Sequence, residues 1–269
     1  MGRFFDPHIH MYSRTTDDYE KMSLAGIEVI VQPSFWLGSP RTSVGTFIDY
    51  WEHMISFETK RAKEYGIEHF TCISVNPKES MERPLAFDAF NAMMRNNFLK
   101  RERVVALGEI GYNQINDLEE EVFKKQLEIC KSENLLAMIH LPHLNKSEGM
   151  RRMKKILEVE DFDFNKILID HNTEETIKMT LEMGAWAGLS VYPITKLSPG
   201  RVINIVNEYG SERIMVNSAA DWGKSDPLSV PLTAKEMRMN GCSTKDIKKV
   251  TFENAYEFYK QSENFTWRP

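Results

Sequence analysis

The stretch Phe4-Phe5-Asp6-Pro7-His8-Ile9-His10 lies near the start of the chain and decides between two ways of building an α/β protein. It begins with aromatic residues typical of a buried strand and ends in a pair of histidines. An open doubly wound sheet that binds a dinucleotide would carry a glycine-rich phosphate turn after its first strand, and this sequence has none there. The stretch therefore favours another arrangement of parallel strands.

Seven more apolar or β-branched runs follow along the chain, separated by amphipathic stretches. The predicted strands cover residues 4–10, 28–33, 70–75, 104–111, 135–141, 166–171, 185–192 and 213–218. The predicted helices cover residues 47–65, 86–100, 118–132, 148–160, 174–183 and 201–209, and two more at 229–239 and 244–259 complete the outer ring. Such alternation indicates βαβ units and a parallel sheet. Eight units in 269 residues predict a (β/α)8 TIM barrel that forms a single domain over residues 1–269.

The composition is that of an ordinary globular protein. Hydrophobic residues make up 42% and charged residues 27% of the chain, which excludes disordered and fibrous classes. No stretch approaches the roughly 18 apolar residues of a membrane helix, and the start lacks a long apolar secretory segment, so we expect a cytoplasmic protein. The net charge is −5 and basic residues are spread along helices. A nucleic-acid partner is therefore disfavoured, and a small-molecule substrate is expected.

Six ionisable side chains fall where barrel enzymes place their chemistry, at the C-terminal ends of the predicted strands. They are His8, His10, Glu109, His140, His171 and Asp221. Residues two apart on a strand point to the same side, so the two histidines of the first strand can share one ion. Asp6 has the same parity and could orient an imidazole. Six such residues at one end of a barrel predict a metal centre.

Imidazole and carboxylate ligands together suit Zn, Mn, Fe or Co. Four histidines and two carboxylates exceed the needs of one catalytic ion, so we expect two divalent ions about 3.5–4 Å apart. The predicted arrangement has one ion at His8, His10 and Asp221, the other at His140 and His171, and a bridge at Glu109. Water held between such ions loses a proton near neutral pH. Asp221, as general base, and Glu109, as bridge, are the predicted catalytic residues.

With these residues in this order, the chain resembles the TatD-like branch of the amidohydrolase superfamily, in an atypical subgroup. The matching motifs are Asp6-x-His8-x-His10, Gly-Glu109-Ile-Gly, Ile-His140, Asp-His171, Asp221 and the closing Thr251-Phe-Glu-Asn-Ala. The resemblance covers nearly the whole chain. It implies a two-metal barrel hydrolase, and many members of the family are metal-dependent deoxyribonucleases.

The chain departs from the TatD nucleases at positions close to these motifs. Asn76 stands where they have a histidine, Asn113 where they have an aspartate, and Pro142 where they have an arginine. Ala219-Ala220 replaces their acidic-threonine pair. Because an arginine suits contacts to phosphate, its absence argues against a phosphodiester substrate.

We therefore expect metal-dependent hydrolysis of an ester, amide, lactone or phosphoester bond in a small molecule. A TatD-type deoxyribonuclease and a non-hydrolytic metal-binding barrel of a biosynthetic pathway remain as alternatives. Residues just past the strand ends should form the substrate pocket. The pocket candidates are Trp36, Asn76, Tyr112, Asn113, His143, Asn172, Tyr192, Lys196 and Trp222.

Overall fold

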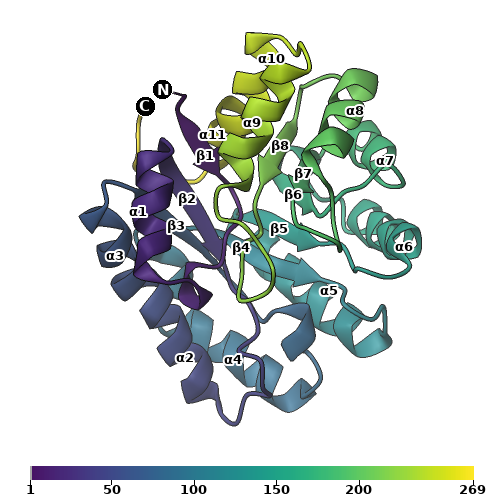
Figure 1. Cartoon of the computed structure of the whole chain (residues 1–269). Coiled ribbons are helices and arrows are strands. Elements are labelled where there is room, and N and C mark those ends of the chain that lie inside the picture. The colour runs from purple at the N-terminus through teal and green to yellow at the C-terminus, as the bar shows by residue number, and fades with distance from the viewer. Residues whose placement is uncertain (1) are drawn as a thin grey trace.

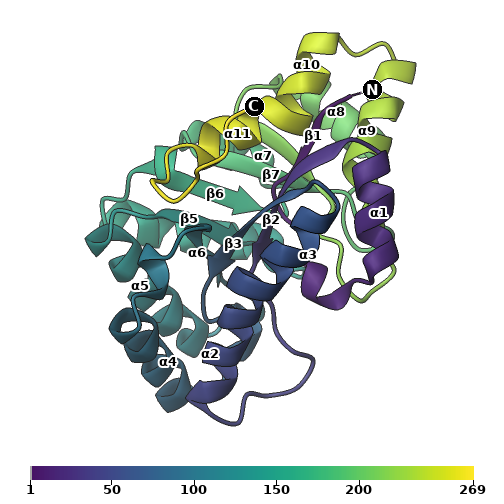
Figure 2. The ribbon, with the colours of Figure 1, turned by 90° about the vertical axis from the view of Figure 1, so that its left-hand side faces the viewer.

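Eight parallel strands form the centre of the molecule in this computed structural model, which describes residues 2–269. They pair in chain order, each with the next. Their bounds are β1 (Phe4–Asp6), β2 (Ile27–Pro33), β3 (Glu68–Ile73), β4 (Val104–Gly111), β5 (Leu136–His140), β6 (Ile167–Asp170), β7 (Trp186–Ser190) and β8 (Ile214–Asn217). Figures 1 and 2 show the strands inside a ring of helices.

The sheet curves until its first and last strands meet, and the joint between them lies just beyond the strand ends. The backbone N–H of Ala219 donates to the carbonyl of His8 at 2.8 Å, and the N–H of His10 donates to the carbonyl of Ala220 at 2.8 Å. We call these two segments, residues 8–10 and 218–220, the closing seam. The predicted (β/α)8 TIM barrel is confirmed.

Most helices form the outer layer, and those that precede β8 connect successive strands. The helices are α1 (Thr16–Leu24), α2 (Val44–Glu52), α3 (Thr59–Glu64), α4 (Arg83–Arg95), α5 (Asp117–Ser132), α6 (Lys146–Val159), α7 (Ile177–Glu182), α8 (Pro199–Tyr209), α9 (Ser229–Met239), α10 (Thr244–Lys248) and α11 (Asn254–Tyr259). Short 3-10 or π turns add η1 (Met11–Ser13), η2 (His53–Glu58), η3 (Pro77–Glu79), η4 (Phe98–Lys100), η5 (Phe164–Lys166) and η6 (Lys249–Glu253). Helix α1 was not among the predicted helices, because its polar sequence buries only Asp18, Tyr19 and Met22 and so shows no broad apolar stripe.

The barrel interior is filled at the end opposite the predicted site. Phe5 of β1 stacks on Tyr259 and Phe265 with ring centroids 5.8 and 6.1 Å apart, and Phe70 of β3 lies 4.4 Å from Phe265. Tyr259 also donates a hydrogen bond to the carbonyl of Pro7 at 3.0 Å. The segment 254–265 thus packs under the barrel rather than completing the outer ring as predicted, so access to the interior is from the C-terminal ends of the strands.

Candidate metal centre

Five of the six predicted residues converge at the C-terminal end of the barrel. His8 and His10 follow β1, which ends at Asp6 because Pro7 has no N–H to donate to the ladder. Glu109 lies within β4, His140 is the last residue of β5, and His171 follows β6. All five side chains are buried.

One oxygen of Glu109 is the centre of this cluster. Its Oε1 lies 2.9 Å from His140 Nδ1, 3.2 Å from His171 Nε2 and 3.4 Å from His8 Nε2. His10 joins through its Nε2, which lies 2.9 Å from His8 Nε2. The other oxygen, Oε2, accepts a hydrogen bond from Asn76 Nδ2 at 3.1 Å. The carboxylate is therefore fixed among imidazole nitrogens, as expected of a ligand shared between two positions.

Within residues 2–269 the ligand atoms form three overlapping groups, each close enough together for a cation. They are His8, His10 and Glu109; Glu109, His140 and His171; and His8, Asp170 and His171. Glu109 belongs to two of them, and its place as a bridge remains a prediction. Histidine nitrogen and carboxylate oxygen suit borderline divalent ions. The residues present therefore fit the predicted metals, although whether one ion or two bind remains a prediction.

The electrostatics of the cluster favour cation binding. Burial lowers the pKa of His10, His140 and His171, so these imidazoles stay neutral and keep a lone pair for coordination. Burial alone would raise the pKa of Glu109, but the neighbouring His8 and His140 hold it well below its usual value. These three neutral imidazoles and the ionised Glu109 can accept a cation. At His8, by contrast, burial would lower the pKa but the charges of Glu109 and Asp170 outweigh it and raise the pKa.

Asp221, the sixth predicted residue, lies apart from this cluster. It follows β8 on a loop, is half-buried, and its Oδ1 accepts hydrogen bonds from Tyr192 OH at 2.8 Å and from Gly223 N at 2.7 Å. Among residues 2–269, the groups of side chains spaced for a metal do not include it. The structure places its carboxylate in the cavity wall, and its role as ligand or base remains a prediction.

A cavity of about 440 Å³ opens over the cluster, a volume within the usual range for small-molecule sites. Of the pocket candidates, Asn76, His143, Tyr192 and Lys196 line it. Trp36 and Trp222 do not line it, although the Trp222 ring lies 5.2 Å from that of Phe35, a lining residue. Tyr112, Asn113 and Asn172 do not line it; Tyr112, for example, packs on Phe123 instead.

Residues 5–260 match the protein family described as TatD related DNase. The chain belongs to this family. The prediction of a TatD-like metal-dependent hydrolase is confirmed at the level of the family. No helix among the described residues of this TatD-family protein has both the length and the apolar character needed to cross a membrane.

Two archaeal proteins resemble this TatD-family chain along nearly their whole length. One, described as an uncharacterized metal-dependent hydrolase of Methanocaldococcus jannaschii, is 29% identical over 95% of this chain and 99% of its own. The other is the TatD-like protein of Archaeoglobus fulgidus, whose crystal structure has a TM-score of 0.79 at 28% identity and covers 96% of this chain and 100% of that one.

More distant structures share the barrel alone. The phosphotriesterase homology protein of Escherichia coli, solved with phosphate in its active site, has a TM-score of 0.71 at 13% identity over 96% of this chain and 98% of its own. A lactonase from Listeria monocytogenes has a TM-score of 0.64 at 14% identity over 96% and 94% of the two chains. At these identities the likeness shows the fold.

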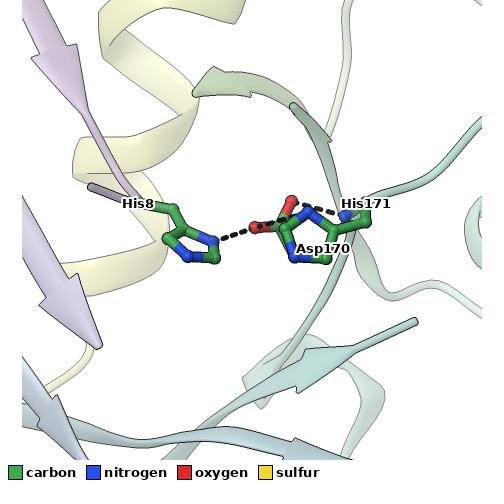
Figure 3. Close-up of side chains that lie close together, drawn as sticks. All are labelled: His8, Asp170 and His171. Atoms are coloured by element: carbon green, nitrogen blue, oxygen red, sulfur yellow. Dashed lines mark hydrogen bonds and ion pairs between the residues drawn. The ribbon is translucent and has the colours of Figure 1, made fainter. Parts of the chain in front are cut away.

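Asp170, which the sequence reasoning passed over, is the main support of the cluster. Its carboxylate pairs with His8 Nδ1, accepts from the backbone N–H of His171 at 2.7 Å and accepts from Asn217 Nδ2 at 2.9 Å. Figure 3 shows it between the two histidines. The sequence did carry a signal, because Asp170 is the ionisable residue of an otherwise apolar strand, and a buried carboxylate needs a partner.

Asp6, predicted to orient an imidazole, instead joins the ends of the sheet. Its Oδ1 accepts from the backbone N–H groups of His8 and Ser218, both at 3.2 Å. The residue is fully buried. Asp6 therefore ties the backbone at His8 to the backbone just past β8. Asp170, rather than Asp6, pairs with the His8 imidazole.

Proposed function

We propose that this chain binds divalent cations between its four clustered histidines and Glu109 and uses them to hydrolyse an ester, amide, lactone or phosphoester bond in a small molecule. The observation that carries the proposal is Glu109 Oε1, buried within 3.4 Å of nitrogens from three histidines. A buried carboxylate is costly unless it is paired. A bound cation would complete the pairing.

A divalent ion held there would supply Lewis acidity and lower the pKa of a water to about 7. The chain's own residues would then position the ligands and accept a proton. Asn76 holds Glu109 in place through its 3.1 Å hydrogen bond, and Asp170 does the same for His8. Asp221 faces the cavity as a carboxylate able to accept a proton, and the hydroxyl of Tyr192 positions it.

Metal analysis of protein purified without added ions tests the first half of this proposal. We expect divalent metal in the wild type and its loss in Glu109→Gln, because that change removes the charge shared by the two groups of ligands that contain Glu109. Glu182→Gln on α7 is the matched control, since Glu182 is exposed and its nearest cation is Lys178 at 3.8 Å. Equal metal content in the wild type and the Glu109→Gln variant would contradict the proposal.

A substrate panel tests the second half. Esters, lactones, amides and phosphoesters are incubated with metal-loaded protein, and we expect turnover that falls at least about a hundredfold in Glu109→Gln. If no scissile substrate turns over while metal is bound, the chain is a metal-binding barrel without hydrolysis.

Membership in the TatD family makes a deoxyribonuclease the second candidate. It predicts release of nucleotides from single-stranded DNA in the presence of Mg or Mn, abolished in Glu109→Gln. A preparation that binds metal and leaves DNA intact, yet cleaves a small ester or lactone, would decide for the first candidate.

A further inference from the structure

Three lysines from different strand-to-helix connections gather at the open end of the barrel. Lys78 belongs to η3 after β3, Lys146 is the first residue of α6 after β5, and Lys196 lies on the loop between β7 and α8. All three are half-buried rather than extended into solvent. Long cationic side chains are mostly exposed in folded proteins, so three partly buried at one place need a reason.

The lysines connect the cavity over the cluster with a second one. Lys78 and Lys196 line the cavity of about 440 Å³, and Lys146 and Lys196 line an adjoining cavity of about 740 Å³. The two cavities also share His143, Leu144 and Thr195. At its inner end, Lys196 Nζ comes within 3.4 Å of His171 Nε2. A ligand that reaches the cluster therefore passes Lys196 and can extend toward Lys146.

None of the three lysines is paired with a carboxylate. Among the ion pairs that residues 2–269 form, those made by lysines involve other residues, such as Lys21, Lys124 and Lys249. Burial and the neighbouring ammonium of Lys196 lower the pKa of Lys146 to about 8. Lys196 and Lys146 thus lie close enough to repel each other, a cost that a bound anion would remove.

The charges around the cavity become positive once metal is bound. Four carboxylates act on the lysine pair: Glu109, Asp170 and Asp221 on Lys196, and Asp170 and Glu175 on Lys146. Against the three ammonium groups they leave a single negative charge. Any divalent ion in the cluster then leaves an excess of positive charge. Such a cavity selects ligands that carry negative charge.

We propose that Lys146 and Lys196 form a subsite for an anionic group of the substrate, a phosphate or a carboxylate next to the scissile bond. The inference deepens the proposed hydrolase function and rests on it. The anion lies in the space that the two cavities share, between the two ammonium groups. Lys78, whose Nζ lies 4.8 Å from the Trp36 ring, adds positive charge from the other side of the cavity over the cluster.

The first experiment measures binding of two probes, inorganic phosphate and malonate, to metal-loaded protein by isothermal titration calorimetry. Lys146→Met and Lys196→Met should each weaken binding of at least one probe by about tenfold to a hundredfold, the usual worth of a hydrogen bond to a charged group. Lys224→Met is the control, because Lys224 is an exposed lysine on the β8–α9 loop that lines neither cavity. Lys146→Arg, which keeps the charge, should retain most of the affinity.

A second measurement locates the probe without relying on variants. Wild-type protein is acetylated at its amines with and without each probe, and mass spectrometry reports the labelling of each lysine. Protection of Lys146 and Lys196 but not Lys224 supports the subsite, and the probe that protects shows whether the group is a phosphate or a carboxylate. Equal acetylation of Lys146 and Lys196 with and without both probes overturns the proposed subsite.

The metal content of each sample separates this inference from the proposed function. Metal-loaded protein whose probe affinity is unchanged in both methionine variants overturns the lysine subsite and leaves the metal centre standing. Wild-type protein that binds no metal overturns the proposed function, and the subsite with it.

Discussion

At the scale of single residues, the cluster depends on a carboxylate that has no place in the predicted ligand set. Asp170 pairs with His8 Nδ1 and holds the backbone of His171, which adopts a left-handed conformation with φ of 60°. A partner on the far nitrogen of an imidazole fixes its tautomer and its direction. Asp170 thereby directs Nε2 of His8 toward Glu109.

We expect Asp170→Asn to weaken metal binding by about tenfold to a hundredfold, the usual effect of losing such a supporting carboxylate. Titration with Zn or Mn, followed calorimetrically, measures the change. Asp88→Asn on the exposed face of α4 is the control and should leave the affinity unchanged. Equal affinities for Asp170→Asn and the wild type would show that His8 does not need this partner.

The space for Asp170 exists because residue 188 of β7 is a glycine. A β-carbon at Gly188 would lie 2.0 Å from Asp170 Oδ1, too close for any real contact. Gly188→Ala should therefore destabilise the fold by about 1–3 kcal/mol and disturb metal binding as well. Urea unfolding measures the first effect and metal titration the second.

Gly45→Ala serves as the comparison for that prediction. Gly45 is the second residue of α2, and its β-carbon would meet only Ser43 Oγ at 3.5 Å. Alanine suits a helix better than glycine by up to about 1 kcal/mol, so this variant should be as stable as the wild type or more so. A Gly188→Ala variant of wild-type stability would mean that Asp170 can move without loss.

At the scale of elements, the β2–α2 loop that carries Phe35 and Trp36 is tied down by a buried ion pair. Arg41 Nε lies 2.6 Å from Glu79 Oε1, with both side chains at most 3% exposed, and Arg41 Nη1 donates to the carbonyl of Thr46 at 2.6 Å. The guanidinium also stacks between Phe47 and Tyr50. The pair thus joins η3, which holds Lys78, to the aromatic side of the cavity.

Arg41→Met leaves Glu79 buried without its partner, and we expect a loss of about 3–5 kcal/mol in the free energy of unfolding. Urea denaturation monitored by circular dichroism measures it. The control is Arg83→Met, which breaks the exposed pair with Glu121 and should change stability by no more than about 1 kcal/mol. Similar losses of stability in both variants would show that the buried pair contributes no more to the free energy of unfolding than the exposed pair.

The strands and helices show which parts of the fold sequence patterns can predict. The fourth strand was predicted with its observed bounds, because eight consecutive buried residues give an unbroken apolar signal around Glu109. The first strand was predicted to reach residue 10 but ends at Asp6, since the pattern of residue types continues after the ladder has stopped. The alternation of strands and helices, and the position of the proposed ligands at strand ends, could be predicted from the periodicity of apolar residues. Helix α1 was missed because its buried face is narrow.

The positions of loop side chains could not be predicted from such patterns. Asp221 stands at a plausible position in the sequence, but the direction of its carboxylate depends on Tyr192 and Gly223, which approach it only in the folded loop. The lysine pair at the cavity is likewise assembled from loops after β5 and β7, and no local pattern relates them. These contacts depend on tertiary structure.

At the scale of the whole molecule, the proposed metal ligands connect one segment of the closing seam, residues 8–10, with the opposite wall of the barrel. His8 and His10 belong to it, while Glu109, His140 and His171 come from strands on the far side of the barrel. A cation bound to all of them would link segments that otherwise share only a few hydrogen bonds. Metal should therefore stabilise the barrel as a whole.

Chelation tests this expectation. A ligand present at a hundred times its dissociation constant stabilises the folded state by about 2.7 kcal/mol, so metal-loaded protein should melt measurably above protein treated with EDTA. Hydrogen exchange should show the largest change at the amides of His10 and Ala219, which form the seam. A change confined to loops far from the seam would contradict this view of the barrel.

The position of the seam also bears on how the protein is made. Residues 8–10 are synthesised some two hundred positions before the residues that hold their backbone, 218–220. Contacts so distant in sequence form slowly and late. During translation His8 and His10 therefore lack their backbone partners. In the nascent chain, these two ligands are held in position only after β8 has emerged. We therefore expect stable cation loading to follow the synthesis of β8.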